Sequence, residues 1–170
     1  MRGVFIGVFL LQLILSLIFL LFLPDRVAIH FGAGGLADGW GSKWTGFCLG
    51  LGVQVSLFCV FYFMDRIMFW FPVRWVNLPN RTYWLAPERR EETREKLSAF
   101  MLPFGIAFFL FFMAMNALTF HANLSDPVRL DMRFFWACFI LFLAYTVYWC
   151  VRLCLEWRIP DQDKTKEKTG

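Results

Sequence analysis

The chain has 170 residues, of which 59% are hydrophobic and 20% aromatic, and it carries a formal net charge of +4 at pH 7. One soluble domain of this length cannot hide so much apolar surface in its core, so the composition excludes an ordinary soluble protein. The basic residues lie beside the ends of apolar segments, which favours a lipid bilayer as their partner and excludes nucleic acid.

Four long apolar segments run through the chain, at residues 3–23, 45–64, 99–120 and 134–155. Each is close to the ~20 residues that cross a bilayer core of ~30 Å as an α-helix. Only a helix of this length satisfies its own backbone hydrogen bonds in lipid. We therefore predict an all-α integral membrane protein in which four transmembrane helices form one domain over residues 1–160, followed by a polar cytoplasmic tail at 161–170.

The basic residues are divided unequally between the two sides of this predicted bundle. The side that holds both termini and the second loop carries 13 Lys and Arg residues, whereas the first and third loops together carry 4. Positive charge is retained on the cytoplasmic side of a membrane. Both termini and the second loop should therefore be cytoplasmic, with the first and third loops outside.

The first loop, residues 24–44, combines glycines with aromatic and aliphatic side chains. Five glycines fall within ten residues: Gly32, Gly34, Gly35, Gly39 and Gly41. Glycine allows turns and positive φ angles, and Trp40 and Trp44 suit the membrane boundary. This pattern predicts a compact, ordered loop at the outer membrane surface.

The outer loops also collect both histidines of the chain. His30 and Asp38 lie in the first loop and His121 lies near the third. Imidazole and carboxylate are zinc ligands, but this spacing matches no metal motif, so we favour a hydrogen-bonded scaffold and expect no cofactor. We also expect Lys43 to lie near enough to Asp38 for a charge-assisted contact.

Polar side chains inside the apolar segments have no partner in lipid. Gln12 and Gln54 fall at the same predicted depth on neighbouring antiparallel helices, and Asn116 lies in the outer third of the third helix. Interhelical hydrogen bonds are the favoured interpretation, and a substrate pathway is the alternative. The adjacent pair Asp65 and Arg66 ends the second segment, where a boundary salt bridge explains it.

Two GxxxG spacings allow close approach between helices. Gly3 and Gly7 lie at the inner end of the first helix, and Gly46 and Gly50 at the outer end of the second. Because these ends are opposite, the two motifs cannot pack on each other. A second copy of the chain is therefore one partner that the sequence leaves open.

The second loop predicts an elbow on the membrane surface that leads into the third helix. A turn is expected at residues 77–80, and Pro87 suits the first position of a helix. Acidic residues follow at once and basic residues later, as the helix dipole favours. Pro103 should kink this helix.

Each of these loops contains a recognisable motif. The motif of the first loop consists of Pro24, His30, Gly35, Asp38, Gly41, Ser42 and Lys43. The motif of the second loop consists of Asn77, Pro79, Asn80, Tyr83, Trp84, Pro87, Glu88 and Arg89. Both motifs resemble those of an uncharacterised bacterial membrane domain that forms the N-terminal part of SdpI-type toxin-immunity proteins. The resemblance implies a bacterial cytoplasmic membrane and, by analogy, toxin immunity or membrane signalling.

No catalytic motif accompanies these loops, since the sequence has no nucleophile with a base at useful spacing, no zinc-protease motif and no phosphate loop. We therefore favour a non-enzymatic membrane protein that binds a peptide or protein partner. An outward-facing metal enzyme or metal sensor built on His30, Asp38 and His121 is one alternative. An accessory subunit of a membrane transport complex is another.

Overall fold

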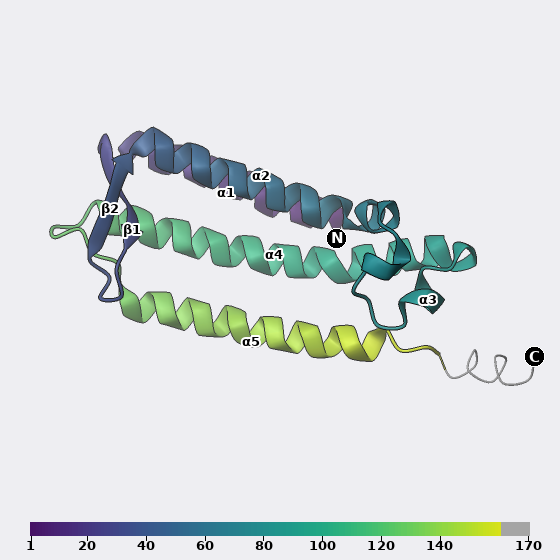
Figure 1. Cartoon of the computed structure of the whole chain (residues 1–170). Coiled ribbons are helices and arrows are strands. Elements are labelled where there is room, and N and C mark those ends of the chain that lie inside the picture. Colours follow the sequence, from purple (N-terminus) through teal and green to yellow (C-terminus); the bar gives the residue numbers. More distant parts are fainter. Residues whose placement is uncertain (161–170) are drawn as a thin grey trace, which may run out of the picture.

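The computed structural model describes residues 1–160, so the predicted polar tail lies outside the described residues. Four helices are long and apolar enough to cross a membrane: α1 (Arg2–Phe22), α2 (Lys43–Ile67), α4 (Arg90–Asn123) and α5 (Met132–Glu156). They run side by side, with a β-hairpin across one end of the bundle and a set of short turns at the other (Figure 1). We call these the hairpin end and the elbow end.

The hairpin consists of β1 (Arg26–Phe31) and β2 (Ala37–Ser42), which pair antiparallel with a bulge between Ala28 and His30. The turn between the strands depends on Gly35, which has a φ of +80°. Gly35 also lies against the loop that precedes α5, where a Cβ would be 2.6 Å from the Leu130 carbonyl oxygen. The expected all-α class therefore needs correction, because two paired strands organise the outer loop of this mostly helical chain.

Helix α4 is the centre of the bundle and packs against α1, α2 and α5. Phe5 of α1 and Phe109 of α4 are fully buried between α1, α2 and α4, where Phe9 and Phe58 stack beside them. At Gly105 a Cβ would lie 2.7 Å from the Phe5 ring, so glycine is what lets α1 approach α4 here. Helix α5 packs chiefly on α4, and none of its residues is buried.

The elbow comprises four short elements: η1 (Met68–Trp70), η2 (Val73–Trp75), α3 (Arg81–Trp84) and η3 (Pro87–Arg89). Pro87 begins η3 as predicted for a first helical position, and α4 follows without a gap. Glu88 and Arg89 therefore belong to η3, and the charged residues after them form the first turns of α4. Pro103 lies inside α4, which remains one continuous helix across it.

The elbow holds the end of α5 by its carbonyl groups. The Asn80 side chain and the Trp84 indole each donate a hydrogen bond to the Trp157 carbonyl, both at 2.9 Å. Lys96 donates to the Glu156 carbonyl at 2.7 Å and lies over the Trp84 ring. These donors satisfy carbonyl groups that a helix end leaves without intrahelical partners. The elbow is therefore a cap for α5.

Candidate functional site

A cavity of about 390 Å³ lies beneath the hairpin, between α1, α2 and α4. Its walls are mostly aromatic and aliphatic, with Phe19 from α1, Phe47 from α2 and Phe112 and Phe120 from α4. On one side of the cavity, Gly46 of α2 faces the hairpin. A Cβ at this position would lie 3.7–3.8 Å from the side chains of Ile29 and Val27. The second GxxxG motif thus lines this cavity.

Neutral polar side chains form the deep end of this cavity. Ser16, Gln54 and Asn116 line it, and Gln12 lies directly behind them. The amide nitrogen of Asn116 donates to the Ser16 hydroxyl at 2.8 Å, and those of Gln12 and Gln54 approach the same oxygen at 3.4 and 3.5 Å. The structure therefore brings the three predicted intramembrane residues together, but around Ser16 rather than through a direct bond between the two glutamines.

Two amide oxygens in this cluster have no partner. The Oε1 atoms of Gln12 and Gln54 are buried without a hydrogen bond among the described residues, and the two residues are 0% and 3% exposed. An unpaired buried acceptor costs about 1–3 kcal/mol relative to a paired one. Of these two oxygens, only that of Gln54 belongs to a residue that lines the cavity. Sequence analysis missed Ser16, since a lone serine in an apolar helix usually bonds its own backbone, as Ser16 also does to the Gln12 carbonyl.

The hairpin is fixed over the cavity by contacts to α4 and to the loop before α5, and a hydrogen bond between the adjoining ends of α1 and α2 closes its base. The Asn123 side chain of α4 accepts a hydrogen bond from the Ala28 amide at 2.6 Å and donates one to the Ala28 carbonyl at 3.3 Å. Lys43 of α2 donates to the Leu23 carbonyl at the end of α1. The amide of Ala37 in β2 also bonds the Val128 carbonyl in the loop before α5. Asn123 thus satisfies the backbone amide and carbonyl of Ala28 in β1, as a neighbouring strand would.

The expected contact between Lys43 and Asp38 is wrong. Lys43 forms an ion pair with Asp25 at 3.1 Å, because the base of the hairpin brings these two residues together. Asp38 pairs instead with His30 across the strands, with 2.5 Å between the carboxylate and Nδ1. This His–Asp pair is exposed, at 73% and 53% of the two side chains.

The metal interpretation receives no support from the geometry. His121 lies near the end of α4, and no three His, Cys, Asp or Glu side chains within residues 1–160 gather closely enough to hold a metal ion. A zinc site needs three or four such ligands around one point. The structure places His30 with Asp38 and leaves His121 outside that pair.

The other motif residues lie at places that shape the backbone. Ser42 accepts a hydrogen bond from the Thr45 amide and so caps the start of α2. Pro24 follows Leu23, the C-cap residue of α1, and Gly41 lies against Ile29. In the second loop, Asn80 has a left-handed backbone with φ of 54°. The rest of that motif forms the elbow itself: Asn77, Pro79, Tyr83, Trp84, Pro87, Glu88 and Arg89.

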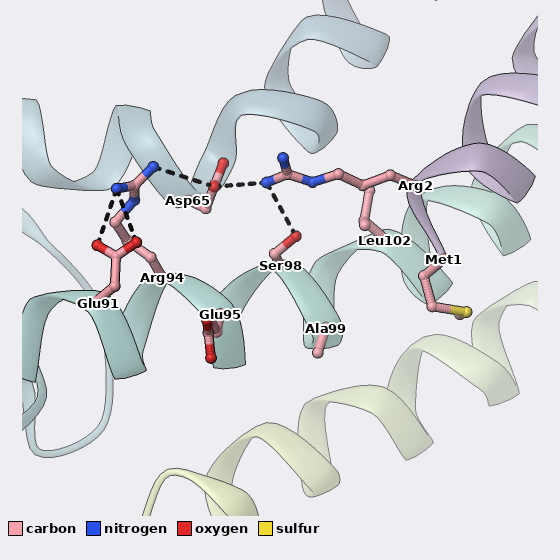
Figure 2. Close-up of a pocket in the computed structure, with 9 residues that line it drawn as sticks. All are labelled: Met1, Arg2, Asp65, Glu91, Arg94, Glu95, Ser98, Ala99 and Leu102. Atoms are coloured by element: carbon pink, nitrogen blue, oxygen red, sulfur yellow. Dashed lines mark hydrogen bonds and ion pairs between the residues drawn. The ribbon is translucent and has the colours of Figure 1, made fainter.

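A second, charged cavity of about 450 Å³ lies at the elbow end (Figure 2). Figure 2 shows Asp65 of α2 between two arginines, with Arg2 of α1 at 2.8 Å and Arg94 of α4 at 3.9 Å. The Asp65 side chain is only 5% exposed. The predicted boundary salt bridge between Asp65 and Arg66 is therefore replaced by one that ties three helices together. Sequence reasoning could not find Arg2 and Arg94 as partners, because they meet Asp65 only through folding.

Comparison with known protein families gives one match. Residues 7–55 match a domain of unknown function (DUF1648). This DUF1648 domain spans most of α1, the hairpin and the first half of α2, so it supplies Gln12, Ser16 and Gln54 of the polar cluster. No curated protein and no solved structure matches the chain, and no SdpI-type relative is found. The matched residues thus form the walls of the hairpin cavity that come from α1, the hairpin and α2, and α4 forms the remaining wall.

Proposed function

We propose that the chain is a non-enzymatic, multi-pass membrane protein that binds a hydrophobic peptide, or a hydrophobic segment of a protein partner, in the cavity beneath the hairpin. The observation that carries this proposal is an apolar cavity whose deep end holds polar side chains, among them Gln54 with a buried, unpaired amide oxygen. Pockets with apolar walls and a few placed polar groups are typical ligand sites.

The orientation in the membrane follows from charge. The four basic residues outside the predicted cytoplasmic segments all lie at the hairpin end: Arg26, Lys43, Arg129 and Arg133. The elbow end carries the arginines of the second loop, and a bacterial cytoplasmic membrane retains such positive charge inside. The cavity therefore opens within the outer half of the bilayer, where a peptide arriving from outside would insert.

The polar end of the cavity favours a peptide over a lipid. A phospholipid that enters from the outer leaflet carries its methyl ends deepest, and these cannot bond the oxygens of Gln12 and Gln54. A peptide carries backbone N–H groups at every depth, and each one needs an acceptor in lipid. The unpaired amide oxygen of Gln54 would supply such an acceptor near the middle of α2.

Toxin immunity and membrane signalling are the biological settings that fit such a site. The resemblance of both loop motifs to the SdpI-type domain supports them by analogy. In an immunity role, capture of a hydrophobic peptide in the outer leaflet would stop it from disrupting the bilayer. In a signalling role, the occupied cavity would change the packing of α1 and α2, whose other ends reach the elbow end.

Photo-crosslinking of the protein in its native membrane tests the proposal. A photoreactive phenylalanine analogue replaces Phe47, which lines the cavity, and in a separate variant it replaces Ile140, which is exposed on α5. We expect mass spectrometry to identify a peptide adduct at position 47 and lipid adducts alone at position 140. Lipid adducts alone at both positions would overturn the proposal.

A further inference from the structure

A small basic cavity lies at the elbow end, apart from the hairpin cavity. It measures about 210 Å³ and is lined by Arg66 from the end of α2, Phe69 and Trp70 from η1, and Arg90 and Arg94 from the start of α4. Three of its five lining residues are arginines, and none is acidic. Such a concentration of one charge attracts anions to the site.

Two of the three arginines have no protein counter-charge. Arg66 and Arg90 are exposed, and neither forms a hydrogen bond or ion pair within residues 1–160. The Arg90 guanidinium lies over the Phe69 ring at 4.9 Å, which holds its direction without neutralising its charge. Their donors are therefore available to a ligand.

The third arginine joins this cavity to the charged cavity of Figure 2. Arg94 forms an ion pair with Glu91 at 3.1 Å and also reaches Asp65, which it shares with Arg2. Its Nε is buried and has no partner among the described residues. Arg94 is thus held in place by the acids on one side while it contributes positive charge to the basic cavity on the other.

We infer that this basic cavity binds the phosphate group of an anionic phospholipid. Guanidinium groups present paired N–H donors that match phosphate oxygens, and an arginine cluster is the usual protein partner of such a group. A zwitterionic headgroup fits poorly, because its ammonium group would meet the same arginines. This inference depends on the membrane setting and not on what the hairpin cavity binds.

The surrounding aromatic residues identify a lipid as the source of the phosphate. Trp70 in the cavity wall is 78% exposed, and Trp75 nearby in the elbow is 65% exposed. Exposed indole rings are most stable at the headgroup level of a bilayer. The basic cavity therefore lies where phospholipid phosphates are concentrated, and Phe69 and Trp70 offer apolar surface to the first carbons of the acyl chains.

The test measures lipid binding to the purified full-length chain by native mass spectrometry. Phosphatidylglycerol is the anionic probe, phosphatidylcholine is the zwitterionic one, and inorganic phosphate is the soluble competitor. We expect phosphatidylglycerol to bind and the double variant Arg66→Gln/Arg90→Gln to bind it about tenfold more weakly, because two charge-assisted contacts are lost. The control Arg133→Gln/Arg158→Gln removes the same charge from positions that do not line the cavity.

The inference is overturned if the control double variant loses affinity as much as the test variant, since charge alone would then explain binding. It is also overturned if phosphatidylcholine binds equally well. Displacement of phosphatidylglycerol by an equimolar amount of inorganic phosphate would show a soluble anion site instead of a lipid site. If the double variant does not fold, Arg66→Gln and Arg90→Gln are measured singly, and each should weaken binding about threefold.

Discussion

At the scale of single residues, the most informative group is the polar cluster around Ser16. Its hydroxyl is the shared acceptor for three amide nitrogens, whereas the oxygens of Gln12 and Gln54 accept nothing. Each unpaired buried acceptor costs free energy, and Asp65 Oδ1, in the contact that joins three helices, is another one. The cluster therefore has two candidate roles, ligand binding and helix packing.

Substitutions in this cluster should separate these two roles. Gln54→Leu should leave the melting temperature in detergent unchanged or raise it, because an unpaired buried oxygen is removed. The same change should abolish the peptide adduct at position 47. Ser16→Ala should lower stability by about 1 kcal/mol, since it removes the shared acceptor. A Gln54→Leu variant that melts well below the wild type and keeps its adduct would mean that the amide is structural.

The exposed pair of His30 and Asp38 yields a different expectation. An exposed hydrogen-bonded pair contributes about 0–1 kcal/mol, so His30→Ala should lower the melting temperature only slightly. Elemental analysis should find the same metal content in wild type and variant. A full equivalent of zinc that disappears with His30→Ala would instead support the metal alternative.

At the scale of the elements, the helices and the hairpin differ in how well the sequence predicts them. Length and hydropathy locate all four long helices within a few residues at most ends, because lipid permits no other structure for such segments. The main exception is α4, whose charged first turns extend it back to Arg90. The hairpin was not predicted, because its strands are only six residues each and β2 contains two glycines, which weaken any strand pattern.

The attachment of the hairpin to α4 depends on one side chain. Asn123→Ala removes both hydrogen bonds to Ala28 and leaves a buried amide and carbonyl of β1 without partners. We expect faster hydrogen exchange at Ala28 and a loss of about 1–3 kcal/mol in stability. Ser56→Ala is the control, since that hydroxyl bonds only its own helix on an exposed face. Equal exchange at Ala28 in the Asn123 variant and the wild type would show that other contacts hold the hairpin.

At the scale of the whole molecule, the cavity and the charged contacts arise only from assembly. Gln12 and Gln54 could be paired from their depth in two helices, but the hairpin above them and Asn116 beside them come from distant segments. Likewise, Asp65 meets Arg2 and Arg94 across 63 and 29 positions of sequence. Spacing along one helix carries no signal for such contacts.

The orientation of the whole bundle is a prediction that labelling can check. In a cysteine-free variant, a single cysteine at position 38 should react with a membrane-impermeant reagent in intact cells. A cysteine at position 88, in the elbow, should react only after the membrane is permeabilised. The reverse pattern would place the hairpin in the cytoplasm and would remove the proposed route of a peptide from outside.

The most direct measurement of the central claim is a density map of the protein purified from its native membrane in a lipid nanodisc. The proposal predicts peptide density in the cavity beneath the hairpin, with a backbone nitrogen at ~3 Å from the Gln54 amide oxygen. A cavity that holds only water or an acyl chain, in protein taken from cells that make the partner, would contradict it.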